Sequence, residues 1–525
     1  MTRTHNAATS PPANAMTSAT DAPIVPLWAA LLLAVGAGPV LDAGFPDLGV
    51  WPLAFVGIAI VLVAVIGRRA GTSFLVGFVA GLSFYLVHVS WTALYLGPVP
   101  WVALSTLESL FFGAGALLIT LAFRWFPRIW SGPVARIGVL PVLVAALWTA
   151  REMVAGTWPY GGFAWGRVAL SQSESPFAPL VAWVGISGLS FIMVAIVAVA
   201  VQVLREPAPG LGRRMAVPAV LVVAALAIPA WPTSVFGTSR IAAVQGNIKA
   251  GYFDAADREP GDLILGQLDA SLPIVGEGVD MIVWPEGASE YDPATVPAAA
   301  QALTTLSELA GGAPIILGTN QERDERVYNT SVLWENGRVE DWYDKKHPVP
   351  FGEYVPDREF WEPFAPDLIG LIGRDYTPGT RDGVFDVNGV IAGINICFDI
   401  VDDAVIRDSV DRGAQVLLAQ TNNADFGRTD ENQQQLAITR LRAIETSRSV
   451  VSISTVGLSA IIGPSGETIS TVPAYEPGAL VEDVPLSRDL TPAVVLGGQL
   501  EGLIVGWGLG TLVIAGLLGA RRRRG

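Results

Sequence analysis

The sequence contains a single cysteine, Cys397, and this thiol is the first candidate for chemistry. An unpaired cysteine is often only a small buried apolar residue, so the flanking sequence must distinguish a nucleophile from a core position. Cys397 ends the apolar run Val390–Ile396 and precedes a predicted helix. A helix N-terminus and a nearby lysine both stabilise a thiolate. We therefore expect a reactive thiol with a lowered pKa at the end of a strand.

Two other predicted strands end in polar residues that could assist a thiol. The apolar run Met281–Trp284 is followed by Glu286, a plausible general base. The proline-rich segment Tyr343–Pro356 contains Lys345 and Lys346, two of only three lysines in the chain. Acyl transfer through cysteine requires a nucleophile, a base and a cation or donor for the oxyanion. The three strand ends together carry these groups.

Histidine is the usual base beside a catalytic cysteine, but the chain has only three histidines. His5 lies in the polar N-terminal tail and His88 lies in an apolar segment. His347 is next to the lysine pair and directly before a proline, where a structural or lid role is equally plausible. The sequence therefore favours a carboxylate as the base.

An α/β domain must position these residues, because short β-rich runs alternate with stretches of helical character between residues 240 and 454. Functional residues in such folds tend to follow the ends of strands. The predicted strands are Arg240–Gln245, Asp280–Trp284, Pro314–Gly318, Tyr328–Trp334, Val390–Ile396, Gln415–Ala419 and Val450–Ser454. The predicted helices are Asp262–Leu272, Ala298–Leu309, Asp403–Arg412 and Asn432–Ser447.

The chain as a whole is too apolar for a soluble protein. The 525 residues are 51% hydrophobic, and their mean hydropathy is +0.46. Residues 240–490 carry 40 acids against 18 bases, whereas the remainder carries 15 bases and 8 acids. This division predicts one acidic soluble domain among membrane segments with basic flanks. The acidic balance also argues against a nucleic-acid partner.

Eight apolar segments are candidate membrane spans, several of them near the length of about 20 residues that a helix needs to cross the hydrocarbon core. They are Leu27–Leu41, Trp51–Ile66, Thr72–Leu96, Trp101–Phe123, Val134–Ala150, Leu180–Val203, Ala216–Val235 and Leu503–Ala520.

Charge placement predicts the orientation of these spans, because Lys and Arg near span ends favour the cytoplasm. With a cytoplasmic N-terminus, thirteen of the fifteen bases outside the acidic domain fall inside. This parity places the acidic domain on the extracytoplasmic side. The predicted divisions are a disordered cytoplasmic tail (1–25), a membrane domain with about seven transmembrane helices (26–236), the extracytoplasmic domain (237–492), a C-terminal transmembrane helix (493–520) and a basic cytoplasmic tail (521–525).

Five motifs, in this order and within this layout, resemble the nitrilase superfamily and, within it, the apolipoprotein N-acyltransferase family. They are VQGNI (Val244–Ile248), WPEGA (Trp284–Ala288), YDKKHPVPFGEYVP (Tyr343–Pro356), Cys397-Phe398-Asp399 and TNNADFG (Thr421–Gly427). The resemblance implies an α-β-β-α sandwich for the extracytoplasmic domain, attached to an α-helical multi-span membrane domain. It implies no cofactor and no metal.

The resemblance also implies roles for particular residues. Cys397 would be the nucleophile, Glu286 the general base and Lys345 the residue that stabilises the tetrahedral intermediate, with Lys346 as the rival lysine. Glu353 resembles the supporting carboxylate of the family.

Some positions depart from the enterobacterial form of the family. The supporting residues Phe398 and Asp399 stand where that form has Tyr and Glu. The aromatic expected after VQGNI is matched only by Tyr252 or Phe253.

The implied reaction is a ping-pong acyl transfer in a bacterial cell membrane. An acyl chain would pass from a membrane phospholipid to Cys397 as a thioester, and then to the α-amine of the N-terminal S-diacylglyceryl-cysteine of a lipoprotein. The aromatic and apolar segment Val355–Ile372 would be a lid at the lipid surface, or else an ordinary packed loop. Two alternatives are a membrane-anchored nitrilase-type amidase and a scaffold for a polyprenol-phosphate glycosyltransferase, which is also a possible partner of the enzyme.

Overall fold

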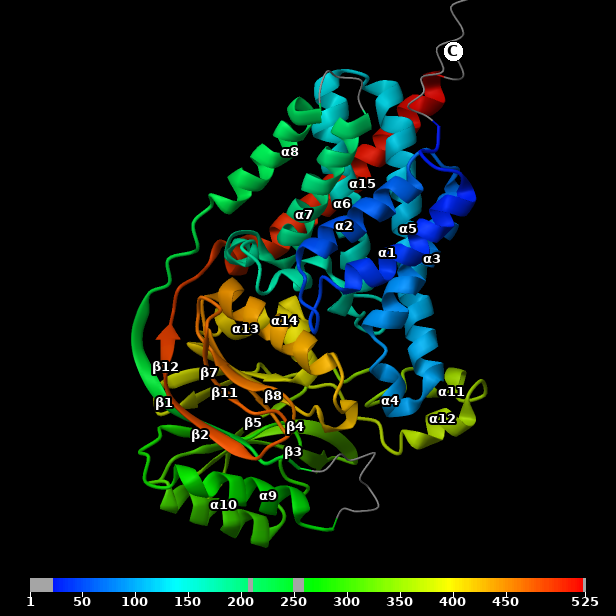
Figure 1. Ribbon diagram of the computed structural model, residues 1–525. Coiled ribbons are helices and arrows are strands. Elements are labelled where there is room, and N and C mark those ends of the chain that lie inside the picture. The colour runs from blue at the N-terminus through cyan, green and yellow to red at the C-terminus, as the bar shows by residue number, and fades with distance from the viewer. Residues whose placement is uncertain (1–21, 206–210, 249–258, 523–525) are drawn as a thin grey trace, which may run out of the picture.

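The computed structural model describes residues 22–205, 211–248 and 259–522 in two parts, a bundle of apolar helices and a domain built on two sheets (Figure 1). The predicted tail up to residue 21, the aromatic residues Tyr252 and Phe253, and the last three residues lie outside this range.

The bundle contains most of the helices of the described chain. They are α1 (Leu27–Asp42), α2 (Pro52–Val65), α3 (Ala70–His88), α4 (Thr92–Leu96), α5 (Pro98–Ile129), α6 (Leu140–Ala155), α7 (Val181–Arg205), α8 (Leu211–Leu226) and α15 (Pro492–Arg522). Five helical stretches are long and apolar enough to cross a membrane: Ala70–His88, Pro98–Ile129, Ala135–Ala155, Ala178–Arg205 and Pro492–Arg522. Three shorter apolar helices, Leu27–Asp42, Pro52–Val65 and Met215–Leu226, lie in the other three predicted segments, but the last ends at Leu226 and not at the predicted Val235.

The predicted span Thr72–Leu96 is not one helix. It ends at His88, and α4 begins at Thr92 after a non-helical Val89. The buried His88 side chain contacts Asp42 of α1 through its Nδ1 atom at 2.9 Å, which gives the last turn of α3 a polar partner. A second break lies inside α7, where Gly185 has a φ of +70° that glycine adopts without steric cost.

The second part of the chain forms two six-stranded sheets. The first has the order β12-β1-β2-β3-β4-β5 and the second has the order β11-β10-β9-β8-β7-β6. The strands of the first sheet are β1 (Val235–Gln245), β2 (Met281–Val283), β3 (Ile315–Arg323), β4 (Arg326–Glu335), β5 (Arg338–Asp344) and β12 (Gly478–Ser487). Those of the second are β6 (Val384–Val387), β7 (Val390–Ile396), β8 (Val416–Thr421), β9 (Ser449–Ser454), β10 (Ser459–Ile462) and β11 (Thr468–Val472).

The sheets pack face to face around a core that includes Ile241, Val283, Ile394, Leu418 and Val451. Helices α9 (Asp262–Ser271) and α10 (Pro297–Leu309) cover the outer face of the first sheet, and α13 (Asp403–Asp411) and α14 (Glu431–Thr446) cover that of the second (Figure 1). Two short helices, α11 (Arg358–Trp361) and α12 (Pro366–Leu371), form a separate arm. The α-β-β-α sandwich implied by the resemblance is confirmed.

Helices α13 and α14 lie between the second sheet and the bundle, so the two parts share one apolar core (Figure 1). Ile406 of α13 and Leu441 of α14 belong to the same buried cluster as Trp148 of α6. Polar contacts add to this packing, because the indole N–H groups of Trp91 and Trp165 both donate to Oε1 of Gln434, at 3.2 and 2.7 Å. The domain of two sheets is therefore fixed against the bundle and not loosely tethered to it.

Candidate active site

Cys397 lies where β7 ends and a 3-10 turn, Cys397–Val401, begins. Its φ of +50° is in the left-handed region, which costs a non-glycine residue on the order of 1–3 kcal/mol. A sharp, strained turn between a strand and a helix projects a side chain out of a sheet edge, as nucleophile turns in hydrolases do. The half-buried sulfur accepts a hydrogen bond from Nε2 of Gln435 at 3.8 Å.

Glu286 follows β2 and is 7% exposed. Lys345 follows β5, and its Nζ lies 3.4 Å from Oε1 of Glu286 and 2.8 Å from Oε2 of Glu353. The backbone N–H of Lys345 donates to the carbonyl of Asn329 in β4 at 2.9 Å, which anchors the residue to the sheet. One buried ammonium thus lies between two carboxylates, of which Glu286 comes from a distant part of the chain and Glu353 from the same segment as Lys345.

The structure separates the two neighbouring lysines. Lys346 turns to the surface, where its Nζ lies 3.2 Å from Asp408 and 3.7 Å from Asp382. The imidazole of His347 lies 3.3 Å from Asp402. Neither side chain joins the pair of glutamates, so of these three residues only Lys345 is placed to act with Glu286.

Asn329 is a site residue that the sequence analysis missed. Its Nδ2 donates to Oε1 of Glu286 at 2.7 Å and to Oε1 of Glu353 at 3.0 Å, so one amide holds both carboxylates beside the lysine. Asn329 is 7% exposed. The available signal was the polar run Asn329-Thr330-Ser331 inside an otherwise apolar strand, because buried polar groups require partners.

The pKa of the Cys397 thiol differs from the expectation. Burial raises this pKa well above its ordinary value, and Glu286 raises it further, while Lys345 acts in the opposite direction. The expected lowering was therefore wrong, because desolvation and the surrounding carboxylates outweigh the lysine. A thiol that is neutral at pH 7 needs a base to become a nucleophile.

Glu286 and Lys345, whose charges act on the thiol, both have shifted pKa values. Burial raises the pKa of Glu286, Lys345 lowers it, and Glu353 raises it again, with a net increase. A carboxylate made more basic in this way is better matched to a thiol proton. Burial opposes the charged form of Lys345, but Glu286 and Glu353 outweigh burial and hold the lysine pKa well above its usual range. Lys345 is therefore a permanent cation.

The two residues that follow Cys397 hold and flank the turn. The buried carboxylate of Asp399 accepts hydrogen bonds from the Tyr343 hydroxyl at 2.9 Å and from the backbone N–H of His347 at 3.1 Å. Phe398 stacks on Trp165 of the bundle, with ring centroids 6.1 Å apart and an interplanar angle of 3°. Asp399 thus links the cysteine turn to the segment that carries Lys345, and Phe398 links it to the bundle.

Buried arginines fix the far end of the same turn. Arg442 of α14 donates to the carbonyls of Ile400 and Val401 at 2.9 and 2.7 Å. Arg167, from the loop between α6 and α7, donates to the Val401 carbonyl at 3.0 Å and to Asp403 at 2.7 and 3.0 Å. Burial raises the pKa of Asp403, but the two guanidinium groups outweigh it and hold that pKa well below its usual range. The bundle therefore contributes directly to the position of the cysteine turn.

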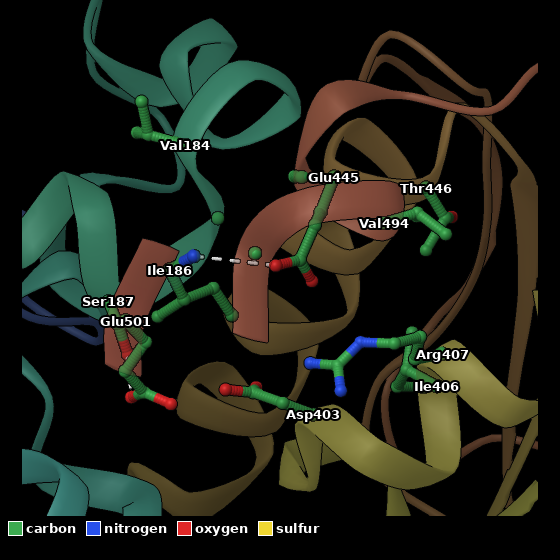
Figure 2. A pocket seen from close by; sticks show the side chains of 13 residues that line it. Val184, Ile186, Ser187, Asp403, Ile406, Arg407, Glu445, Thr446, Val494 and Glu501 are labelled. Carbon is green, nitrogen blue, oxygen red and sulfur yellow. Dashed lines mark hydrogen bonds between the residues drawn. The ribbon is translucent and has the colours of Figure 1, made fainter. Parts of the chain in front are cut away.

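Figure 2 shows the adjacent contact between α7 and α15 of the bundle and α13 and α14 of the sandwich. A cavity of about 30 Å³ at this contact has room for about one water molecule. The Glu445 carboxylate accepts a hydrogen bond from the backbone N–H of Ile186 at 3.3 Å, directly after the break at Gly185. The Ser187 hydroxyl donates to Glu501 of α15 at 2.7 Å. The broken end of α7 is thus capped by a carboxylate of the catalytic domain.

Comparison with known proteins agrees with this division of the chain. Residues 37–199 match the apolipoprotein N-acyltransferase N-terminal domain family. Residues 240–488 match the carbon-nitrogen hydrolase family.

Individual relatives match over different lengths. The apolipoprotein N-acyltransferase of Mycolicibacterium smegmatis is 38% identical over 246 residues, which are 45% of this chain and 40% of that protein. The one from Azotobacter vinelandii is 28% identical over 92% of this chain and 95% of that protein. The one from Shewanella oneidensis is 27% identical over 77% and 80%. A solved amidase from Nesterenkonia sp. is 20% identical over 50% of this chain and 95% of that chain, with a TM-score of 0.37.

The two domain families follow one another in one chain, and relatives match along nearly its whole length. The chain belongs to the apolipoprotein N-acyltransferase family and is an acyltransferase of the nitrilase superfamily.

Proposed function

We propose that this acyltransferase works by a ping-pong mechanism in which Cys397 carries the acyl group as a thioester. The single observation that carries the proposal is the buried Lys345 between Glu286 and Glu353, in electrostatic contact with the only thiol of the chain. Cys397 is the nucleophile, Glu286 the general base and Lys345 the stabiliser of the oxyanion. Glu353 and Asn329 hold these groups in place.

In the first half-reaction Glu286 removes the thiol proton, and the sulfur attacks an ester carbonyl of a membrane phospholipid. Lys345 and a backbone N–H stabilise the oxyanion, an interaction often worth about 3 kcal/mol per donor. When the carbon–oxygen bond breaks, Glu286 returns the proton to the departing lysophospholipid. The products are a thioester on Cys397 and an ionised Glu286.

In the second half-reaction the α-amine of an N-terminal S-diacylglyceryl-cysteine attacks the thioester. The nitrogen loses a proton to Glu286, the carbon–sulfur bond breaks, and the proton passes to the thiolate. The products are an N-acylated lipoprotein and a free thiol. The raised pKa of Cys397 makes the unprotonated thiolate a poor leaving group, so this final protonation is an essential step.

The lipid nature of both substrates is supported by the arm formed by α11 and α12. Phe360, Phe364 and Leu371 are 59%, 73% and 54% exposed on this arm. Large exposed apolar side chains at one place are typical of a surface that contacts lipid or a partner. We propose that the arm is the lid of the active site and contacts the bilayer. The association with a polyprenol-phosphate glycosyltransferase stays a prediction, and co-purification tests it.

We also propose that the catalytic domain, bounded by β1 and β12, lies on the extracytoplasmic side. Arg124 and Arg128 lie near the end of α5 and line one cavity with Arg68 and Arg69. Arg522, at the end of α15, donates to the Arg128 carbonyl at 2.9 Å, at the end of the bundle away from the sheets (Figure 1). A concentration of arginine at one end of a bundle favours the cytoplasm for that end.

The test of the mechanism is intact-mass analysis of the purified protein after incubation with phospholipid. We expect one acyl adduct that hydroxylamine removes and that a diacylated lipopeptide converts into a triacylated product. Cys397→Ala should form no adduct, whereas Lys346→Met serves as the matched control near the site. An adduct on the alanine variant would assign the acyl group to another residue. Hydrolysis without transfer to the lipopeptide would identify an amidase or esterase.

A further inference from the structure

The proposed mechanism leaves one buried carboxylate near the thiol without a role. Glu431 lies in the first turn of α14 and is 2% exposed. Its Oε2 accepts a hydrogen bond from Nδ2 of Asn423 at 2.8 Å. In the part of the chain that the structure describes, its Oε1 has no hydrogen-bond or ion-pair partner. A buried carboxyl with a single hydrogen-bond donor and no counter-charge is costly to ionise.

Two side-chain amides connect Glu431 to the nucleophile. Nδ2 of Asn423 also donates to Oε1 of Gln435 at 3.1 Å, and Nε2 of Gln435 donates to Sγ of Cys397 at 3.8 Å. Glu431 and Gln435 are four residues apart in α14 and therefore project from the same face of the helix. Glu431 therefore belongs to the same hydrogen-bonded group of side chains as the reacting sulfur.

The protonation of Glu431 suits exchange with an amine. Burial, followed by the charge of Glu286, raises its pKa to about 8. An N-terminal α-amine has an ordinary pKa of about 7.7–8.0. At pH 7 a carboxyl of this pKa is mainly protonated in the free enzyme, but an ammonium ion beside it favours the ionised form, so the incoming amine itself prepares the acceptor. Because the two pKa values are similar, the proton can then pass from the ammonium to the carboxylate at little cost in free energy. Glu286 is the charged group that acts on Glu431, and Glu431 in turn raises the pKa values of the Cys397 thiol and of Tyr475.

The second half-reaction needs such an acceptor. At neutral pH the α-amine of the lipoprotein is mainly an ammonium ion and cannot attack. Glu286 transfers one proton from the nitrogen to the sulfur during the attack. An ammonium ion carries one proton more than the neutral amine, and this additional proton requires another acceptor. We propose that Glu431 binds the incoming α-ammonium and accepts this proton, and that it is thus a catalytic residue of the aminolysis half-reaction. The inference rests on the proposed ping-pong function.

The step balances in atoms and charge. The nitrogen–hydrogen bond of the ammonium breaks, and a bond forms between that proton and the Glu431 carboxylate, which leaves a neutral amine. The amine attacks the thioester, its second proton passes through Glu286 to sulfur, and the amide and the thiol form. Glu431 then releases its proton to water. No oxidant, metal or further reactant is required.

The test separates the two half-reactions in Glu431→Gln, which keeps the size of the side chain and a partner for Asn423. Thioester formation is measured first in a single turnover, and the acyl-enzyme is then chased with diacylated lipopeptide at pH 7. We expect acylation within about twofold of the parent and a chase slowed about 10²-fold, the lower end of the range for acid–base catalysis. At pH 9.5 the gap should narrow, because the neutral amine needs no acceptor.

Two controls make the result specific. Hydroxylamine is neutral at pH 7, so it should cleave the thioester of parent and variant at equal rates. Asp430→Asn removes a neighbouring carboxylate at the same end of α14 and should leave both half-reactions at the parental rate. Glu431→Asp, which draws the carboxyl back, is the second variant if the glutamine protein does not fold, and it should also slow the chase selectively.

The outcomes distinguish a failure of the ping-pong function from a failure of the role proposed for Glu431. If the parent protein forms no thioester, the ping-pong function is wrong. If the parent forms it and the Glu431 variants are chased at the parental rate, Glu431 is not the acceptor. Equal slowing of acylation and chase, or a slow chase in Asp430→Asn, would assign Glu431 a structural role at the helix end and overturn the inference.

Discussion

Replacing Lys345 with methionine is the most informative perturbation of the site, because a methionine of similar length removes the ammonium that lies between Glu286 and Glu353. Its Nζ lies 3.4 Å from Glu286 and 2.8 Å from Glu353. We expect Lys345→Met to leave phospholipid binding near the parental level while thioester formation collapses. An interaction made only in the transition state affects the rate and not the binding of substrate.

The size of the loss follows from two contributions. A lost oxyanion partner costs about 3 kcal/mol, which is a factor of about 10² in rate. The attraction between unit charges 3.4 Å apart is about 5 kcal/mol at an effective dielectric constant of about 20. Without this attraction the pKa of Glu286 rises further, and a protonated Glu286 cannot remove the thiol proton. Together these contributions predict a fall of at least about 10³-fold at pH 7.

The assay is the rate of acyl-adduct formation by intact mass in a single turnover, with phospholipid binding measured separately. Lys346→Met is the matched control, since its Nζ contacts Asp408 and Asp382 at the surface. That variant should acylate within about twofold of the parent, because exposed ion pairs contribute little. A collapse in Lys346→Met together with a parental rate in Lys345→Met would refute the assignment of the lysine.

Three further predictions concern other parts of the molecule. Glu286→Gln should slow thioester formation by about 10²–10⁴-fold, the range of general-base catalysis. Glu353→Gln should slow the lipopeptide chase more than acylation. Single-turnover experiments measure the rates of the two half-reactions in each variant. Arg167→Met should lower the unfolding free energy by about 3 kcal/mol, because it leaves the Asp403 carboxylate with one arginine fewer. The depressed pKa of Asp403 means that this contribution is complete above about pH 4 and is lost on further acidification, so parent and variant should converge in melting temperature at low pH. On intact cells, with Cys397→Ala as the background so that the native thiol cannot react, an impermeant thiol reagent should label a cysteine placed at residues 321–326 and not one placed after Arg524. The reverse pattern would contradict the proposed orientation.

Much of the fold could be predicted from the sequence because its signals are local. Strand β7, Val390–Ile396, matches its prediction at both ends, since an apolar run bounded by Gly389 and Cys397 defines it. Helices α9, α10, α13 and α14 also lie where the pattern placed them. Strand β12 was missed because its burial depends on its pairing with β1, more than 200 residues away in the chain. The short α4 was merged with α3 because both are apolar.

The candidate site, too, could be predicted only where local sequence carries the signal. Local sequence marked Cys397, Glu286 and Lys345 because each follows a strand, but it could not choose the lysine by geometry. Asn329 carries no motif, and its importance comes from two glutamates that the fold brings to it. The direction of the thiol pKa was wrong because burial depends on tertiary packing, and no local rule for a helix N-terminus includes that contribution.

The antiparallel pairing of β1 with β12 has a consequence for the ancestry of the chain. Val235 opposes Ser487 at the end of this ladder nearest the bundle, so the strand that enters the sandwich and the strand that leaves it are neighbours. A domain whose two ends meet can be inserted into a host at a single point, because only a short gap must be bridged. The sandwich has the geometry of a module placed within the loop between α8 and α15. On this view the sandwich interrupts the helical bundle in the sequence but returns the chain, after β12, to a point beside the one at which it left.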